Sequence, residues 1–150
     1  MRIIQICLFS LALIIGSGSV AAALEQIGQI KVASGEVTIE RSGQVTNAKA
    51  GDGLFEGDII RTLANSAVGM TFTDNSRMSL GPDSVLTLEL YSFGAGGQQD
   101  GFNARLRAGS LTAASGEIAK SRPLAMKVLM PTTVLGVKGT EFAVRVSGGE

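Results

Sequence analysis

Apolar and polar residues alternate along short runs of this chain, and this two-residue period constrains its fold more than any other feature. The stretch 29–40 alternates on both sides of Ser34-Gly35, which predicts a hairpin over these residues. Residues two apart on a strand share a face, so alternation indicates strands with one buried face. No stretch carries apolar residues at sustained helical spacing. The pattern therefore predicts an all-β fold.

Turn residues separate the other runs at intervals near the ~8 to 12 residues typical of sandwiches and barrels. Asp74-Asn75 predicts a tight hairpin, because both residue types accept positive φ. The run 85–93 alternates longest and predicts a central strand. Further strands are expected at 59–62, 68–72, 78–80, 102–106, 109–113, 125–129 and 141–146. Together they predict two packed sheets of short, mainly antiparallel strands, as a β-sandwich or a short β-roll.

The N-terminal residues have the organisation of a secretory signal peptide. Arg2 precedes an almost wholly apolar run, and small residues follow it up to Ala21-Ala22-Ala23. An uncleaved anchor is the alternative, because the uncharged run reaches the ~20 residues that a membrane-spanning helix needs. We expect residues 1–23 to be removed and residues 24–150 to form one β domain. That domain is expected in the periplasm or outside the cell, without a transmembrane anchor.

Composition excludes several classes of chemistry. The chain has no His and no Trp, and its single cysteine, Cys7, lies within the predicted signal peptide. Ser/His and Cys/His couples are therefore absent, as is the commonest ligand of zinc, copper and iron. Acidic and basic residues number 13 each, and the basic ones are scattered, whereas nucleic acid requires a dense basic face. We expect no cofactor and no nucleic-acid partner.

Several motifs, taken in order, resemble the FecR domain family. A Gly-Asp turn at Gly57-Asp58 leads into a strand ending in Thr62. A Thr-Asp-Asn-Ser hairpin at 73–76 and a Leu-Gly-Pro stop containing Gly81 and Pro82 follow. A middle strand at 105–111 precedes the closing signature, 131–144, which includes Gly136, Gly139, Thr140 and Phe142. The resemblance covers the chain from about residue 29 to residue 146.

The resemblance implies a periplasmic, all-β domain. FecR proteins are known chiefly as cell-envelope regulators that relay occupancy of an outer-membrane siderophore transporter to a cytoplasmic sigma factor. This sequence departs from such regulators, because we identify no helical anti-sigma segment and no C-terminal domain for meeting a transporter. The resemblance therefore implies an envelope domain and not transmembrane signalling by this chain alone.

Asp52, Glu56 and Asp58 are the carboxylates closest together in a Gly-rich region. They suggest either calcium ligands or an acid pair, but their spacing does not fit an EF-hand loop. Gly-Asp pairs are also typical of turns, because Asp caps nearby amides and Gly accepts positive φ. We therefore interpret these residues as turn residues and assign no metal ligand and no catalytic residue.

The segment Gly136-Val137-Lys138-Gly139-Thr140 is superficially similar to a phosphate-binding loop. In such a loop Lys follows the second Gly and a helix follows Lys, whereas here Lys precedes that Gly and a strand follows. The segment instead predicts a bulge or sharp bend, with an anion nest of exposed amides as the alternative. Ser110, Ser115 and Ser121 have no accompanying elbow motif or base.

These features predict an exported, non-catalytic binding domain whose partner is a protein or an envelope polymer. Exposed strand edges offer backbone groups for strand addition, and the polar loop 94–101 offers a second candidate contact at Gln98, Gln99 and Asp100. Two alternatives stay open. One is a hydrolase of envelope glycans with two carboxyl groups ~5 to 9.5 Å apart. The other is a surface protein that self-associates through its strand edges.

Overall fold

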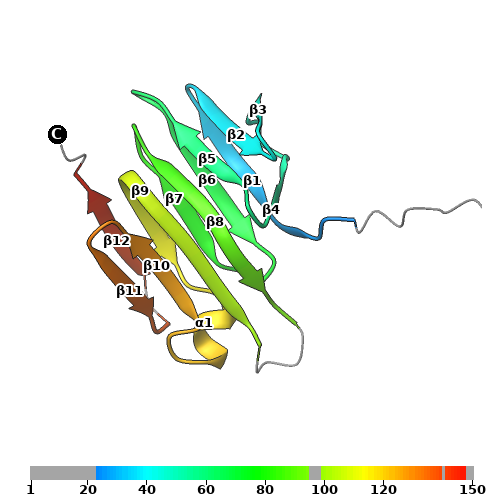
Figure 1. Ribbon diagram of the computed structural model, residues 1–150, viewed down its shortest axis with the longest axis vertical. Helices are drawn as coiled ribbons and strands as arrows, with labels where there is room; N and C mark the ends of the chain where they lie inside the picture. Colours follow the sequence, from blue (N-terminus) through cyan, green and yellow to red (C-terminus); the bar gives the residue numbers. More distant parts are fainter. Residues whose placement is uncertain (1–22, 95–98, 140, 148–150) are drawn as a thin grey trace, which may run out of the picture.

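The structure is a computed structural model that describes residues 23–94, 99–139 and 141–147. These residues form twelve strands and one short helix, so the all-β prediction is confirmed (Figure 1). The predicted signal peptide lies almost entirely outside the described residues and stays a prediction. The elements are β1 (Gln26–Ser34), β2 (Val37–Arg41), β3 (Gln44–Asn47), β4 (Gly53–Phe55), β5 (Ile59–Thr62), β6 (Ala67–Phe72), β7 (Arg77–Leu80), β8 (Val85–Ser92), β9 (Gly101–Ala114), α1 (Glu117–Ser121), β10 (Met126–Met130), β11 (Thr133–Val137) and β12 (Glu141–Val146).

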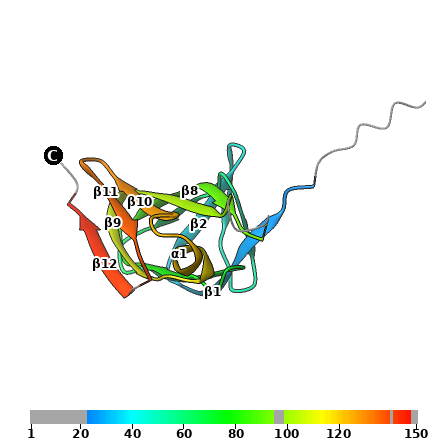
Figure 2. The ribbon, with the colours of Figure 1, turned by 90° about the horizontal axis from the view of Figure 1, so that it is seen from below.

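One sheet curls so that its two halves face each other as layers (Figure 2). The first layer has the order β3-β2-β5-β8-β9, and the second has the order β9-β7-β6-β1-β4. Strand β9 belongs to both, because its first half pairs with β8 and its second half pairs with β7. Gly109, with φ of +84°, lies where β9 passes from one layer to the other. The two expected sheets are therefore one curled sheet, which corresponds to the roll form of the prediction.

The last three strands extend both layers beyond the other edge of β9. Strand β10 pairs with the first half of β9 in parallel, and β11 pairs antiparallel with β10. Strand β12 pairs antiparallel with the second half of β9. The β9–β10 pair is a parallel pair in a sheet whose other pairs are antiparallel, so "mainly antiparallel" is confirmed.

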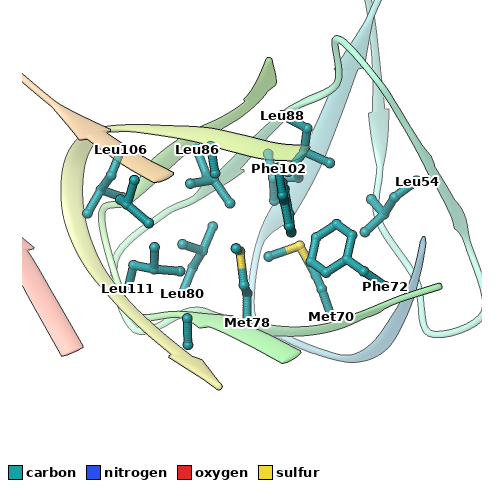
Figure 3. Close-up of a cluster of buried hydrophobic side chains, with 14 of the residues drawn as sticks. Leu54, Met70, Phe72, Met78, Leu80, Leu86, Leu88, Phe102, Leu106 and Leu111 are labelled. Carbon is teal, nitrogen blue, oxygen red and sulfur yellow. The ribbon is translucent and has the colours of Figure 1, made fainter. Parts of the chain in front are cut away.

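The core fills the space between the two layers. Alternate side chains of β4 and β6 to β9 point into it, as Figure 3 shows for Leu54, Met70, Phe72, Met78, Leu80, Leu86, Leu88, Phe102, Leu106 and Leu111. The rings of Phe72 and Phe102 pack edge to face with centroids 4.7 Å apart. At one end of the roll α1 inserts between the layers and buries Ile118 completely (Figure 2). A five-residue helix is too short to show a helical period, which is why the sequence pattern did not predict it.

The hairpin predicted over 29–40 is wrong, because β1 and β2 lie in different layers. Strand β1 pairs with β4 and β6, whereas β2 pairs with β3 and β5. The turn at Gly35, with φ of +75°, crosses between layers, and the backbone N–H of Glu36 donates to Ser66 Oγ at 2.8 Å. An alternating pattern indicates that a strand has one buried face, but it does not indicate which strand pairs with it.

The hairpin predicted around Asp74-Asn75 is confirmed. Strands β6 and β7 pair antiparallel, and Asn75 has φ of +64°. The central strand predicted over 85–93 corresponds to β8, which lies between β5 and β9. The strands predicted separately at 102–106 and 109–113 are one continuous strand, β9, that bends at Gly109.

Side-chain hydrogen bonds fasten the layers together where β9 changes layer. Ser84 Oγ accepts from the backbone N–H of Ser110 at 3.0 Å and donates to the carbonyl of Gly81 at 2.9 Å. Thr62 Oγ1 donates to the same carbonyl at 2.6 Å and accepts from the N–H of Ser84 at 3.0 Å. The Gly81-Pro82 turn identified in the sequence therefore positions this network.

Candidate binding surfaces

The three carboxylates considered as an acid site each accept a backbone hydrogen bond, two of them within their own turns and the third, Glu56, from strand β8. Asp52 Oδ2 accepts from the N–H of Lys49 at 2.8 Å, and Glu56 Oε2 accepts from the N–H of Tyr91 at 2.9 Å. Asp58 is completely buried and accepts from the N–H of Phe55 at 2.9 Å. Asp52 and Asp58 thus stabilise the turns that hold them, whereas Glu56 connects its turn to β8. Within the described ranges, no group of three or more acidic, His or Cys side chains is arranged to hold a metal ion.

Arg41 bridges the two layers at the side of the roll where β3 and β4 end the sheet. Its Nε and Nη2 each donate to a carboxylate oxygen of Asp58 at 2.7 Å, and Nη2 also donates to the carbonyl of Gly53 at 3.0 Å. The guanidinium lies 4.2 Å from the centroid of the Phe55 ring. The hydrogen bonds from Arg41 to Asp58 raise the pKa of the guanidinium above its usual value. This side is therefore closed by an ion pair, and a polar cleft remains outside it.

The cleft beside Arg41 has polar walls. Side chains from both layers line it: Gln26, Ile39, Arg41, Thr46, Asn47, Lys49, Asp52, Gly53 and Phe55. Amide side chains and mixed charges suit a hydroxyl-rich ligand, because they supply both donors and acceptors.

A buried polar network joins the β6–β7 hairpin to α1. Asp74 is completely buried, and its carboxylate accepts from Ser76 Oγ at 2.7 Å and from the N–H of Ser76 at 3.1 Å. Its backbone carbonyl accepts from the N–H of Glu117 at 2.7 Å, and Ser76 Oγ accepts from the N–H of Gly116 at 2.9 Å. The Asp and Ser of the hairpin motif thus hold the helix that closes one end of the roll.

Tyr91 completes this network and carries a perturbed ionisation. Its hydroxyl lies 2.8 Å from Thr73 Oγ1, accepts from the N–H of Asp74 at 2.9 Å and donates to Asp74 Oδ1 at 3.1 Å. Burial, with a further contribution from the Asp74 charge, raises the pKa of the phenol above its ordinary value of about 10.

We expect the folded protein to show no tyrosinate absorbance at pH 10, where the unfolded chain titrates. The pKa of Tyr91 is higher in the folded protein than in the unfolded chain, so the neutral phenol stabilises the fold. This contribution is fully present below pH ~10 and is lost as the pH rises from there through the folded pKa. Tyr91 is the single tyrosine and the chain has no tryptophan, so the ultraviolet absorbance reports this residue alone. Half-titration at pH ~10 with circular dichroism unchanged would contradict the assignment, and Tyr91→Phe provides the blank.

The opposite side of the roll, between β11 and β12, has no such bridge among the described residues. Among the described residues, β11 is hydrogen-bonded to β10 alone and β12 to β9 alone, so each of these strands has one free edge. Apolar side chains lie only half-buried between these strands, at Met130, Leu135, Phe142, Val144 and Val146. Both ribbon views place the two strands at the margin of the molecule (Figures 1 and 2). We call this region the open side.

A groove runs along one end of the open side. It is lined by Arg107, Met130, Pro131, Thr132, Thr133, Arg145, Val146 and Ser147, with no carboxylate among them. Arg107 and Arg145 are exposed and form no ion pair within the part of the chain that the structure describes. The groove therefore combines apolar surface with positive charge.

The closing motif forms the two free strands and the bend between them. Gly136 lies within β11 opposite Lys127, so the bend is not at this residue. Gly139 has φ of +66° and open space around its Cα, which places the predicted bend there. Phe142 follows on β12, and Thr140 lies outside the described residues. The sequence pattern does not identify β11 as a strand, because Val134 and Leu135 are adjacent apolar residues and Gly136 interrupts the run, so Thr133–Val137 lacks clean alternation.

The loop residues predicted as a partner contact have unlike environments. Gln98 lies outside the described residues, and Gln99 is exposed. Asp100 is 4% exposed, its Oδ1 accepts from the N–H of Gly94 at 3.1 Å, and its carbonyl accepts from Arg122 at 2.6 Å. Asp100 therefore supports the base of the loop, and a contact by Gln98 and Gln99 stays a prediction.

The fold and its surfaces define a class of protein, a β-roll whose sheet ends in free strand edges among the described residues. The model of the FecR protein family matches residues 58–150, which is more than half of the chain, so the chain belongs to the FecR family. The match contains the Asp74 hairpin, the Gly81-Pro82 turn and the closing motif. Comparison with curated proteins gives no match, and comparison with solved structures gives none. The family is associated with the cell envelope. No helix in the described ranges is long and apolar enough to cross a bilayer.

Proposed function

We propose that this protein is an exported, non-catalytic recognition module of the cell envelope, which captures an extended segment of a protein partner by strand addition at the open side. The observation that carries the proposal is the pair of free edges on β11 and β12, with half-buried apolar side chains between them. The predicted signal peptide and membership of the FecR family support an envelope location and a role in signalling or maintenance.

Strand addition suits these edges on physical grounds. A free edge presents unpaired N–H and C=O groups that give affinity to any extended segment, and side-chain pockets give selectivity. The apolar side chains of the open side would lose further exposed area under an added strand, at roughly 25 cal/mol per Å². Soluble proteins protect edges that have no function with charge, proline or a covering loop. Strand β11 itself contains no charged residue and no proline, and its Val134 side chain is 59% exposed.

We expect Val134→Lys to abolish capture of the partner, because a lysine on an edge strand opposes strand addition. Val45→Lys is the matched control, since Val45 is 62% exposed and also lies on an edge strand, β3. The measurement is photo-crosslinking in intact cells from a benzophenone residue placed at Thr133. Both variants should keep the melting temperature of the parent protein within error, because neither side chain is buried.

Two results would contradict the open side as the binding surface. One is an undiminished crosslink in Val134→Lys, and the other is an equal loss in Val45→Lys. A joint replacement of Gln98 and Gln99 by serine tests the loop in the same assay. Asp100 is kept in that variant, because its carboxylate holds the base of the loop.

A second candidate ligand is an envelope polysaccharide, favoured by the polar cleft beside Arg41. The side chains of Asn47 and Lys49 line this cleft, and neither makes a hydrogen bond or ion pair among the described residues. Loss of polysaccharide binding in Asn47→Ala, with partner crosslinking retained, would assign the cleft to the polymer. Recognition rather than turnover is part of the proposal. Reproducible glycan cleavage by the purified protein, abolished in Asp52→Ala or Glu56→Ala, would refute it.

A further inference from the structure

We propose that β12 pairs antiparallel with β12 of a second copy of this chain, centred on Ala143, so that the β7 layers of two molecules join into one continuous sheet. The inference deepens the proposed function and rests on its premise that the open side accepts an added strand. In this arrangement the β12 edge binds a second copy of the chain, and the β11 edge remains available to the partner protein.

The sequence of β12 is self-complementary in this register. The outward-facing residues are Glu141, Ala143 and Arg145, which are exposed, and the inward-facing residues Phe142, Val144 and Val146 are half-buried. Antiparallel pairing around Ala143 places Glu141 of each copy opposite Arg145 of the other. It also places Phe142 opposite Val144. Each dimer therefore gains two opposite-charge pairs on one face and two apolar pairs on the other, and both kinds of cross-strand pair are stabilising.

The other registers lack this complementarity. In a continuous sheet, directly opposed residues share a face, so only registers that pair odd-numbered residues with odd-numbered ones keep the apolar side chains together. Shifting the centre to Val144 places Arg145 opposite Ala143 and leaves Glu141 opposite Ser147. Shifting it to Arg145 places two arginines opposite each other, which is destabilising. The register centred on Ala143 alone pairs both charges with their opposites.

Within the structure the two charges have no competing partner. Neither Glu141 nor Arg145 forms an ion pair among the described residues, although Arg77 lies on the same outer face as Glu141 and lines the same shallow pocket. The small side chain of Ala143 at the two-fold axis leaves room for close approach of the strands. An isologous contact of this kind closes after two copies and does not propagate into a fibre.

The test is a pair of charge reversals measured by sedimentation equilibrium on the processed protein purified from the cell envelope. Arg145→Glu opposes two carboxylates at both ends of the contact, and Glu141→Arg opposes two guanidinium groups. Each variant alone should raise the dimer Kd at least about tenfold, because two attractive pairs become two repulsive ones. Mixing the two variants should restore association, since each chain then meets only opposite charges. Lys31→Glu, which changes an exposed charge on β1, should leave the dimer Kd unchanged.

Three results would overturn the inference: a protein that stays monomeric at all concentrations, a dimer insensitive to both reversals, and reversals whose mixture stays monomeric. These failures are distinguishable from failure of the proposed function. If the charge reversals leave the sedimentation mass of the dimer unchanged while Val134→Lys still abolishes the partner crosslink, only the pairing of β12 with a second copy is refuted. If the mixture restores the dimer while no partner is crosslinked, the inference stands and the foreign partner is refuted.

Discussion

Gly109→Val is expected to lower the free energy of unfolding by roughly 2 to 6 kcal/mol. The usual free energy of unfolding is about 5 to 15 kcal/mol, so a parent protein at the lower end of this range would be largely unfolded at about 25 °C by the substitution. Two costs add at this residue. Its φ of +84° is strained for a β-branched side chain, and a Cβ would approach the Cα of Ser84 to 2.5 Å. The position cannot relax easily, because β9 pairs with β7, β8, β10 and β12 around it.

Gly139→Val is the matched control for this prediction. Gly139 also has positive φ, but a Cβ there would meet no atom within 4 Å. Its cost should therefore be the backbone strain alone, about 1 to 3 kcal/mol. Urea denaturation of both variants measures the difference. Equal losses would show that the contact with Ser84 is relieved in the folded state and would contradict the role given to the crossing point.

Asp58→Ala is expected to cost about 3 kcal/mol, at the lower end of the range for breaking a buried ion pair. Asp58 is 0% exposed, and its loss removes the carboxylate that joins Arg41 to the turn before β5. The Arg41 side chain is 37% exposed and can turn towards water, which limits the penalty. The measurement is the urea midpoint at pH 7.

The double variant Arg41→Met with Asp58→Leu distinguishes the loss of the ion pair from the cost of leaving the Arg41 charge unpaired. Replacing both partners with apolar side chains should cost less than Asp58→Ala, because no unpaired charge remains beside the core. A double variant less stable than both single ones would contradict this account. In that case the hydrogen bonds to Phe55 and Gly53 would carry the stability of this side of the roll.

The strands were predictable from the sequence, whereas their neighbours were not. Alternation in 29–40 correctly places two strands with Ser34-Gly35 between them, yet these strands face each other across the core. The Asp74-Asn75 turn differs because Asn75 readily adopts the positive φ, +64°, that this tight hairpin requires. The crossing turn at Gly35 is held by the hydrogen bond from the N–H of Glu36 to Ser66 Oγ, thirty residues away, which no local pattern contains.

Parts of the candidate site were predictable for the same reason. The turn interpretation of Asp52 and Asp58 uses local chemistry, and each of these carboxylates accepts from a backbone N–H of its own turn. Glu56 instead accepts from Tyr91 on β8, a contact that the sequence does not indicate. The polar loop sequence predicts a partner contact at Asp100 together with Gln98 and Gln99. The burial of Asp100 depends on Gly94 and Arg122, which the sequence does not place beside it. The free edges of β11 and β12 follow from sheet order, which depends on long-range pairing.

The position of β9 in both layers also sets the order in which this chain can fold. A growing chain that ends before residue 101 contains the strands of both layers but lacks the one strand that joins them, so each layer ends in an open edge. Pairing between distant strands is slow, because loop-closure entropy must be overcome before the contacts form. Completion of the sheet therefore waits for the last third of the chain, a property that would suit the export proposed above.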